Sequence, residues 1–278
     1  AVVFGSAGPL VGVWCEPEGG HAVAPALVMI NSGVVHSAGA WRLHVRLART
    51  LAAEGVPSLR FDLSGVGDSP PRAGASTLEE VVRQDLDDAL DLVGRETGRR
   101  DAVLMGLCSG AADALDMARH DSDVRGIICI DLIGDFRNWQ HQAVHYARRI
   151  ARLESWKNTL TGRNRFFSRL FGAVRRGDAG GDDRPSGPAQ LGLRPVLSQE
   201  RLRRDLLALL DDQRRVLLVF TGGLERNYNH RSQFREVLPE VARRPELDFS
   251  YFGRSDHTFT DPDNQARLID TIRGWLVR

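Results

Sequence analysis

The chain has 278 residues, of which 42% are hydrophobic and 26% charged, and its formal net charge is +1. This length fits one large α/β domain with an insertion, and the balanced charge gives no strong attraction to nucleic acid. We expect no stable membrane association, because no apolar run approaches the roughly 18 residues of a membrane span.

The cysteines indicate the redox environment. There are three, Cys15, Cys108 and Cys129, and no two of them show a C-x-x-C spacing. The odd number and the spacing argue against a disulfide framework or a zinc site. The opening residues AVVFGSAGPL also lack the basic and apolar regions of a secretory signal. We therefore predict reduced thiols, no bound metal and a cytoplasmic location.

Short β-rich runs alternate with amphipathic helices, a pattern that predicts a mostly parallel central sheet with helices on both faces. Residues 1–5 and 10–17 predict an opening antiparallel pair. A buried strand at 26–33 then precedes a helix at 41–55. The apolar face of this helix is formed by Leu43, Leu47 and Leu51.

The same strand, loop and helix unit is repeated next. Residues 57–70 predict a strand and its loop, and Ser76 with Glu79 forms a capping box that opens the second helix. The apolar face of that helix is formed by Val82, Leu86, Leu90 and Val93. The remaining strands are predicted at 101–106, 124–131, 215–223 and 247–252, and a closing helix at 265–277.

Residues 136–198 differ from this pattern, because they are helical in periodicity and strongly basic. From Phe136 to Arg176 there are ten Arg or Lys residues and one acid, Glu154. We predict a helical lid here, inserted into an α/β core made of 1–135 and 199–278. Its candidate substrate-lining residues are Trp139, His141, His145 and Trp156. The two histidines have an i, i+4 spacing, but with no third ligand in view we favour pocket lining over metal binding.

The stretch MGLCSGA, residues 105–111, predicts a strand, a tight turn and a helix, with Gly106 and Gly110 on either side of Cys108. This is the G-x-S-x-G pattern of a nucleophile elbow, with cysteine in place of serine. At the start of a helix the dipole favours an anion, so we expect the Cys108 thiolate to form readily.

An acyl-transfer site also needs donors for an oxyanion. The backbone N–H of Ser109, which follows the nucleophile, is the first predicted donor. The second is predicted in the loop NSGV after the strand at 26–33, at Gly33 or Val34.

The order nucleophile, acid, histidine along the chain predicts the other catalytic residues. His257, in GRSDHTF after the last strand, is the predicted base, and Glu225 is the predicted acid that orients it. Asp131 and Asp135, which follow the strand after the elbow, are alternatives for the acid. Asp256 is expected to shape the histidine loop.

The run FDLSGVGDS, residues 61–69, is rich in glycine and aspartate. We interpret it as a structural turn that fixes Asp62 and Asp68 by hydrogen bonds below the site.

The runs NSGVVH, FDLSGVGDSP, GLCSGA and SDHTF together resemble the α/β-hydrolase superfamily over nearly the whole chain. More narrowly, GLCSGAADAL and LRFDLSGVGDS are similar to hydrolases of the serine-aminopeptidase-like branch in exosortase-associated and biosynthetic clusters, where cysteine often occupies the elbow. The resemblance implies an α/β-hydrolase fold and a triad of Cys108, Glu225 and His257. The usual acid of the superfamily is aspartate, so Glu225 departs from its pattern.

A cysteine nucleophile suits thioester chemistry, because exchange between two thioesters is nearly balanced in free energy. We therefore expect a thioesterase or acyltransferase that takes an acyl thioester of coenzyme A or an acyl carrier protein and needs no cofactor. The positive charge of the basic segment would attract the phosphates of the donor or the acidic helices of a carrier protein. The alternative is that this segment is a solvated helix whose aromatic residues pack on the core.

Two other functional classes stay open. One is a serine-type esterase or peptidase whose serine was exchanged for cysteine, and the other is a catalytically silent hydrolase fold that serves as a binding module. The acyl chain, the acceptor and the oligomeric state do not follow from the sequence.

Overall fold

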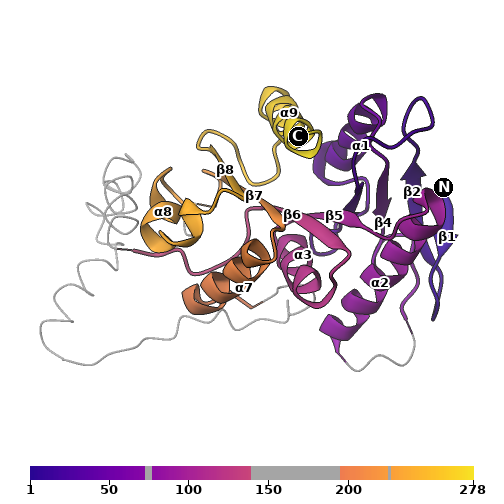
Figure 1. Cartoon of the computed structure of the whole chain (residues 1–278), viewed down its shortest axis with the longest axis horizontal. Coiled ribbons are helices and arrows are strands. Elements are labelled where there is room, and N and C mark those ends of the chain that lie inside the picture. The colour runs from indigo at the N-terminus through magenta and orange to yellow at the C-terminus, as the bar shows by residue number, and fades with distance from the viewer. Residues whose placement is uncertain (73–76, 139–194, 225–226) are drawn as a thin grey trace, which may run out of the picture.

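The computed structural model describes residues 1–72, 77–138, 195–224 and 227–278. Their strands form one sheet of eight strands in the order β1-β2-β4-β3-β5-β6-β7-β8 (Figure 1). β1 (Val2–Phe4) pairs antiparallel with β2 (Leu10–Cys15), and β2 pairs antiparallel with β4 (Ser58–Phe61). The predicted opening antiparallel pair is therefore confirmed.

All remaining neighbours in the sheet are parallel. The strands that follow β4 in the sheet order are β3 (Ala26–Ile30), β5 (Ala102–Leu107), β6 (Val124–Ile130), β7 (Arg215–Thr221) and β8 (Leu247–Phe252). These bounds lie within two residues of the predicted strands at their starts and within three at their ends. The sequence pattern works well here because strands buried on both faces are continuous apolar runs.

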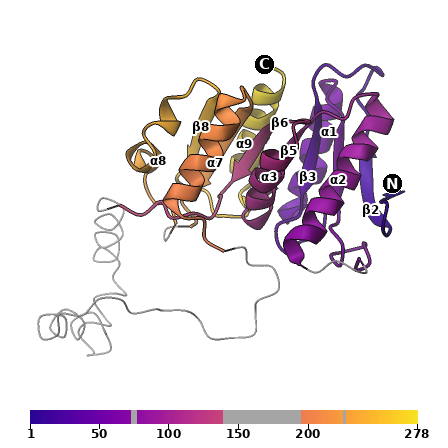
Figure 2. The same ribbon diagram turned by 60° about the horizontal axis from the view of Figure 1, so that its bottom comes forward.

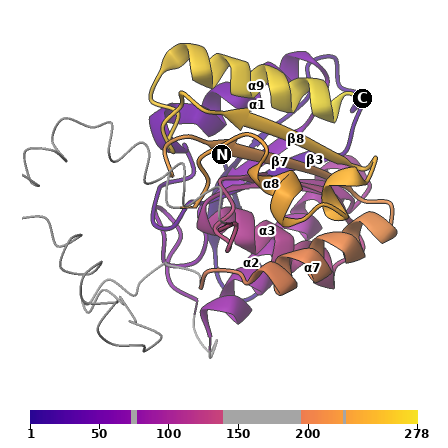
Figure 3. The ribbon, with the colours of Figure 1, turned by 90° about the vertical axis from the view of Figure 1, so that its left-hand side faces the viewer.

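Helices cover both faces of the sheet, as predicted. α1 (Leu43–Ala53) and α9 (Pro262–Leu276) lie together on one face, while α2 (Leu78–Thr97), α3 (Ser109–His120) and α7 (Gln199–Asp211) lie along the other (Figures 2 and 3). Two apolar clusters fill the spaces between the helices and the sheet, one on each face. Short helices at Ala40–Arg42, Gln233–Val237 (α8) and Val241–Arg243 lie in the connections.

The helix faces follow the predicted periodicity. The predicted apolar positions of α1 and α2 are buried against the sheet. The cap of α2 differs from the prediction, because Thr77 has the extended backbone of an N-cap and its hydroxyl accepts a hydrogen bond from the Glu80 N–H at 3.2 Å. Ser76, the predicted cap, lies outside the described residues. Two adjacent hydroxyl residues each offer an N-cap, and the pattern alone does not choose between them.

The core continues into both ends of the predicted insertion. Phe136 is fully buried and stacks edge-on against Phe220 and Tyr228, and Leu197 bridges to Gly134. Phe136 and Leu197, at the two ends of the predicted segment 136–198, thus pack with the core. Among the described residues, no helix is both long enough and apolar enough to cross a membrane.

The parallel strands bring six polar residues to one edge of the sheet. In parallel α/β sheets, side chains that follow the carboxyl ends of the strands meet at such an edge and form the binding site. The residues that follow the ends of β3, β4, β5, β6, β7 and β8, or end the strand itself, are Asn31, Asp62, Cys108, Asp131, Thr221 and His257.

Candidate active site

Cys108 lies at the tight turn between β5 and α3. Its backbone has φ 59° and ψ −113°, in the strained region that L-residues rarely adopt. Glycine is needed on both sides, since a Cβ on Gly106 would lie 2.0 Å from the carbonyl carbon of Gly110, and a Cβ on Gly110 would lie 2.5 Å from the Asn31 carbonyl oxygen. The predicted nucleophile elbow is therefore present in the backbone, and it pushes the Cys108 side chain outward.

His257 lies in the loop between β8 and α9 and contacts two of the candidate residues. Its Nδ1 lies 2.7 Å from Oδ2 of Asp131, and its side chain also hydrogen-bonds Cys108. With a carboxylate on one ring nitrogen, the imidazole presents its other nitrogen to the sulfur. This is the geometry of a nucleophile, a base and an orienting acid.

Asp131 is held rigidly behind the histidine. Its carboxylate is fully buried and accepts hydrogen bonds from the Thr221 N–H at 2.7 Å and the Thr221 hydroxyl at 2.6 Å. Its backbone φ of 48° is unusual for a residue other than glycine. The strained turn and the two donors fix the carboxylate in one orientation, toward Nδ1 of His257.

Among the described residues, Asp131, one of the two alternatives for the acid, is therefore the carboxylate that contacts Nδ1 of His257. The single hydrogen on Nδ1 of His257 is donated to the Asp131 carboxylate, with 2.7 Å between Nδ1 and Oδ2. Glu225 itself lies outside the described residues. Asp135, the third candidate, instead pairs with Arg137 at 2.8 Å. Asp256 accepts hydrogen bonds from Thr258 and Thr260 and so shapes the histidine loop, as expected.

The neighbours of His257 change its protonation. Burial lowers the pKa of the imidazole, but the hydrogen bonds and negative charges of Asp131 and Cys108 outweigh it and raise the pKa to about 9. His257 is therefore an imidazolium at neutral pH in the resting site.

The predicted oxyanion donors lie at the start of α3 and in the loop that follows β3. Ser109 is the first residue of α3, where the backbone N–H has no partner within the helix. The Gly33 N–H does not face the sulfur as a free donor, because it donates to Oγ of Ser109 at 2.8 Å. Val34 follows in the same loop with its side chain 74% exposed. Of the two alternatives for the second donor, the Gly33 N–H is therefore already engaged, and Val34 stays a prediction.

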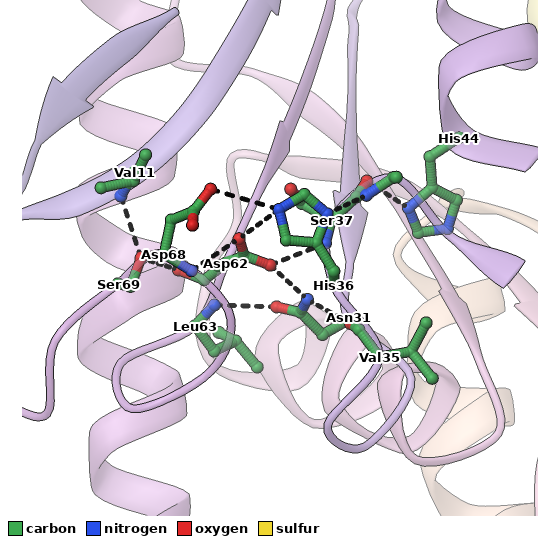
Figure 4. Close-up of polar contacts among 11 residues, drawn as sticks. Val11, Asn31, Val35, His36, Ser37, His44, Asp62, Leu63, Asp68 and Ser69 are labelled. Atoms are coloured by element: carbon green, nitrogen blue, oxygen red, sulfur yellow. Dashed lines mark hydrogen bonds and ion pairs between the residues drawn. The ribbon is translucent and has the colours of Figure 1, made fainter. Parts of the chain in front are cut away.

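The loop that carries Gly33 is fixed by a polar network around Asp62 (Figure 4). Asp62 is 1% exposed, and its Oδ1 accepts from the Ser37 N–H at 2.6 Å and the Asn31 amide at 3.0 Å. Asn31 also donates to the Val35 carbonyl and accepts from the Leu63 N–H. The predicted structural turn below the site is confirmed.

His36, Asp62 and Asp68 have the side-chain types of a metal site, and their ligand atoms lie within 4.8 Å of one another. Nε2 of His36 is 3.3 Å from Oδ2 of both aspartates. However, Nδ1 of His36 accepts the Ala38 N–H at 3.1 Å, which places the ring proton of the neutral form on Nε2. A metal-bound histidine has the opposite arrangement, because its second nitrogen donates a hydrogen. The cluster is therefore a hydrogen-bonded clamp.

The predicted lid residues Trp139, His141, His145 and Trp156 lie outside the described residues, so their roles stay predictions. Sequence reasoning ranked Asp131 second and did not single out Thr221 or Asn31. The signal that identifies Asp131 is its place directly after the strand that pairs with the elbow strand, at the same sheet edge.

Known proteins share this fold. The family described as "Alpha/beta hydrolase family" matches residues 27–271. The esterase domain of a Rhodothermus marinus protein is 19% identical, with a TM-score of 0.58, and the alignment covers 100% of this chain and 97% of that one. Est1E from Butyrivibrio proteoclasticus is 13% identical, with a TM-score of 0.58 and coverage of 100% and 97%. Carboxylesterase CesB from Bacillus subtilis is 15% identical, with a TM-score of 0.55 and coverage of 98% and 92%. At these identities the likeness shows the fold alone. No curated protein sequence matches the chain.

Proposed function

The chain belongs to the alpha/beta hydrolase family, and on that premise we propose that it is an acyl-transfer enzyme with Cys108 as its nucleophile. The observation that carries this proposal is the position of His257, whose side chain hydrogen-bonds Cys108 and, through Nδ1, the buried carboxylate of Asp131. The proposed triad is Cys108, His257 and Asp131. The predicted similarity of the elbow to cysteine-containing hydrolases of biosynthetic clusters supports it.

In the acylation step, the Cys108 thiolate attacks the carbonyl carbon of the substrate, and the carbonyl electrons move onto oxygen to give a tetrahedral oxyanion. Donors beside Ser109 stabilise that charge. The oxyanion then collapses, the bond to the leaving group breaks, and the His257 imidazolium gives its proton to the leaving thiolate. The products are a free thiol and an acyl-enzyme thioester at Cys108.

In the second step, neutral His257 removes the proton of a water molecule or of an acceptor hydroxyl or amine as that group attacks the thioester carbonyl. Asp131 keeps Nδ1 protonated, so that the other ring nitrogen acts as the base. Collapse of the second oxyanion expels the Cys108 thiolate, and the imidazolium is restored. Water gives hydrolysis, and an acceptor gives acyl transfer.

We propose an acyl thioester of coenzyme A or of an acyl carrier protein as the substrate. Sulfur replaces sulfur in the acylation step, so the exchange is nearly balanced in free energy, whereas an ester of an alkanol is a less matched donor. Residues 136–176 carry ten basic residues and one acidic residue. Their charge suits the phosphates of coenzyme A or the acidic helices of a carrier. A thiol nucleophile also requires a reducing compartment, which favours the cytoplasm.

The decisive experiment is intact-mass measurement after mixing the protein with an acyl-CoA. We expect one acyl adduct on the wild type and none on Cys108→Ala. If Cys108→Ser regains rapid esterase activity while the wild type acylates slowly, the chain is a serine-type esterase with an exchanged nucleophile. If the wild type forms no adduct with thioester or ester probes, the proposal fails and the fold serves binding. Product partition with added acceptors then separates transferase from thioesterase.

A further inference from the structure

We propose that the side-chain hydroxyl of Ser109 is a catalytic residue and provides the second hydrogen bond to the oxyanion. This inference rests on the proposed function, because it concerns the same acyl-transfer site. Its starting point is the hydrogen bond from the Gly33 N–H to Oγ of Ser109, at 2.8 Å. That bond engages one of the two loop amides, Gly33 and Val34, that are predicted as the second oxyanion donor.

The hydroxyl of Ser109 still has a hydrogen to donate. A serine hydroxyl has one O–H donor and two acceptor lone pairs, and Gly33 uses only a lone pair. Ser109 is 8% exposed, and within residues 1–72, 77–138, 195–224 and 227–278 the structure gives its hydroxyl hydrogen no acceptor. A buried donor without an acceptor costs free energy, and an oxyanion formed beside Cys108 removes that cost as the transition state develops.

A movement of the loop that turns the Gly33 N–H away from Ser109 is opposed by the loop's own hydrogen bonds. Asn31 and Asp62 tie this loop to β4 through the buried network described above (Figure 4). The Gly33 N–H therefore keeps its direction toward Oγ. The amide polarises the hydroxyl, and a hydrogen bond that is part of such a chain is stronger than an isolated one.

The helix supplies the other donor from the same residue. The backbone N–H of Ser109 lies at the N-terminus of α3, where it has no helical partner and where the dipole favours negative charge. Ser109 thus contributes both its backbone N–H and its hydroxyl, while Gly33 acts as a positioning residue behind the hydroxyl.

The test compares two reactions of Cys108 in the wild type, Ser109→Ala and Ser109→Thr. Acylation by phenyl thioacetate passes through an oxyanion, whereas alkylation by iodoacetamide is a displacement at a saturated carbon and does not. We expect Ser109→Ala to slow single-turnover acylation by about 100-fold, the typical loss of one oxyanion donor. Alkylation should change by less than about 3-fold, and Ser109→Thr, which keeps the hydroxyl, should recover most of the acylation rate.

Three results would overturn the inference. If Ser109→Ala acylates as fast as the wild type or faster, the hydroxyl does not assist acylation and only blocks the Gly33 N–H from the oxyanion. If acylation and alkylation fall equally, Ser109 acts by holding the thiol and imidazole in place. If the wild type is alkylated at Cys108 but never acylated, the proposed function itself fails, and the inference with it.

Discussion

Two buried aspartates at the same edge of the sheet each contact a histidine, and one of these two histidines also contacts Cys108. Asp131 follows β6 and Asp62 follows β4, and their side chains are 0% and 1% exposed. Asp131 accepts the backbone N–H of Thr221, the last residue of β7, and Asp62 accepts the backbone N–H of Ser37, in the loop after β3. By burial and by partner type the two sites are close to equivalent.

The difference lies in the second nitrogen of each histidine. Nδ1 of His257 lies 2.7 Å from Oδ2 of Asp131, and the His257 side chain also hydrogen-bonds Cys108. His36 shares Nε2 between Asp62 and Asp68 at 3.3 Å, and its Nδ1 is occupied by the Ala38 N–H. A buried aspartate and a histidine thus make a reactive pair only where the second ring nitrogen faces a nucleophile. The other pair anchors the loop that carries Gly33.

The most severe test of this contrast is Asp131→Asn. The amide would donate to Nδ1 of His257 and select the wrong tautomer, so we expect kcat to fall by about 10³ to 10⁴-fold, or about 4 to 5.5 kcal/mol in activation free energy. Steady-state turnover of phenyl thioacetate would measure it. The matched control is Glu225→Gln, for which we expect less than about a 5-fold loss. A larger loss for Glu225→Gln than for Asp131→Asn would return the acid role to Glu225.

Loss of Asp62, which anchors the loop that carries Gly33, should lower the free energy of unfolding. Asp62→Ala leaves the buried Ser37 N–H and the Asn31 amide without their acceptor. Each unpaired buried group costs about 1 to 3 kcal/mol, so we expect the free energy of unfolding to fall by about 3 kcal/mol. Urea denaturation measures this change. Asp68→Ala is the control, because its side chain is 68% exposed, and it should cost less than about 0.5 kcal/mol. Equal losses for both variants would contradict the network described here.

The next effect is a pH dependence that only the reactive pair should show. His257 has its pKa raised from 6.5 to about 9 by Asp131 and Cys108 against the opposing effect of burial. A raised pKa means that the folded state binds the proton more tightly than the unfolded state. Its contribution to stability is therefore complete below about pH 6.5 and is lost as the pH rises through about 9.

We expect the step to amount to about 1 to 2 kcal/mol once solvent screening of this partly exposed ring is allowed for. Urea denaturation of the wild type and His257→Gln between pH 6 and pH 10 gives the difference curve. A repeat in the Cys108→Ala background removes the contribution of Cys108 to the pKa of His257 and should leave a smaller step, due to Asp131. A difference curve that is flat in both backgrounds would show that the Asp131 contact does not stabilise the imidazolium.

The sequence predicted the fold and the elbow because both depend on local patterns. Apolar runs and helical periodicity located the strands and helices, and the glycines at 106 and 110 marked a turn that tolerates no Cβ. The choice of acid depends on a non-local contact. Asp131 and Glu225 both follow strands of the core in the sequence. The strained backbone of Asp131, with Thr221 behind it, turns its carboxylate toward His257. The sequence pattern of a single segment does not predict the direction in which the Asp131 carboxylate points.

The smallest effect is expected for substitution of His36. This test shows whether His36, Asp62 and Asp68 form a hydrogen-bonded clamp or a metal site. His36→Ala removes two long contacts of a side chain that is 48% exposed, so we expect a loss of about 0.5 to 1 kcal/mol in stability and less than about a 3-fold change in kcat. Because Nδ1 accepts the Ala38 N–H, Zn²⁺ at micromolar concentration should not raise the melting temperature of the wild type above that of His36→Ala. A zinc-dependent rise in the wild type alone would require the ring to release Ala38 and rebind its proton on Nδ1. His36 would then be a metal ligand. The Asp62–His36 pair would differ from the Asp131–His257 pair by a bound ion as well as by the partner of the second ring nitrogen.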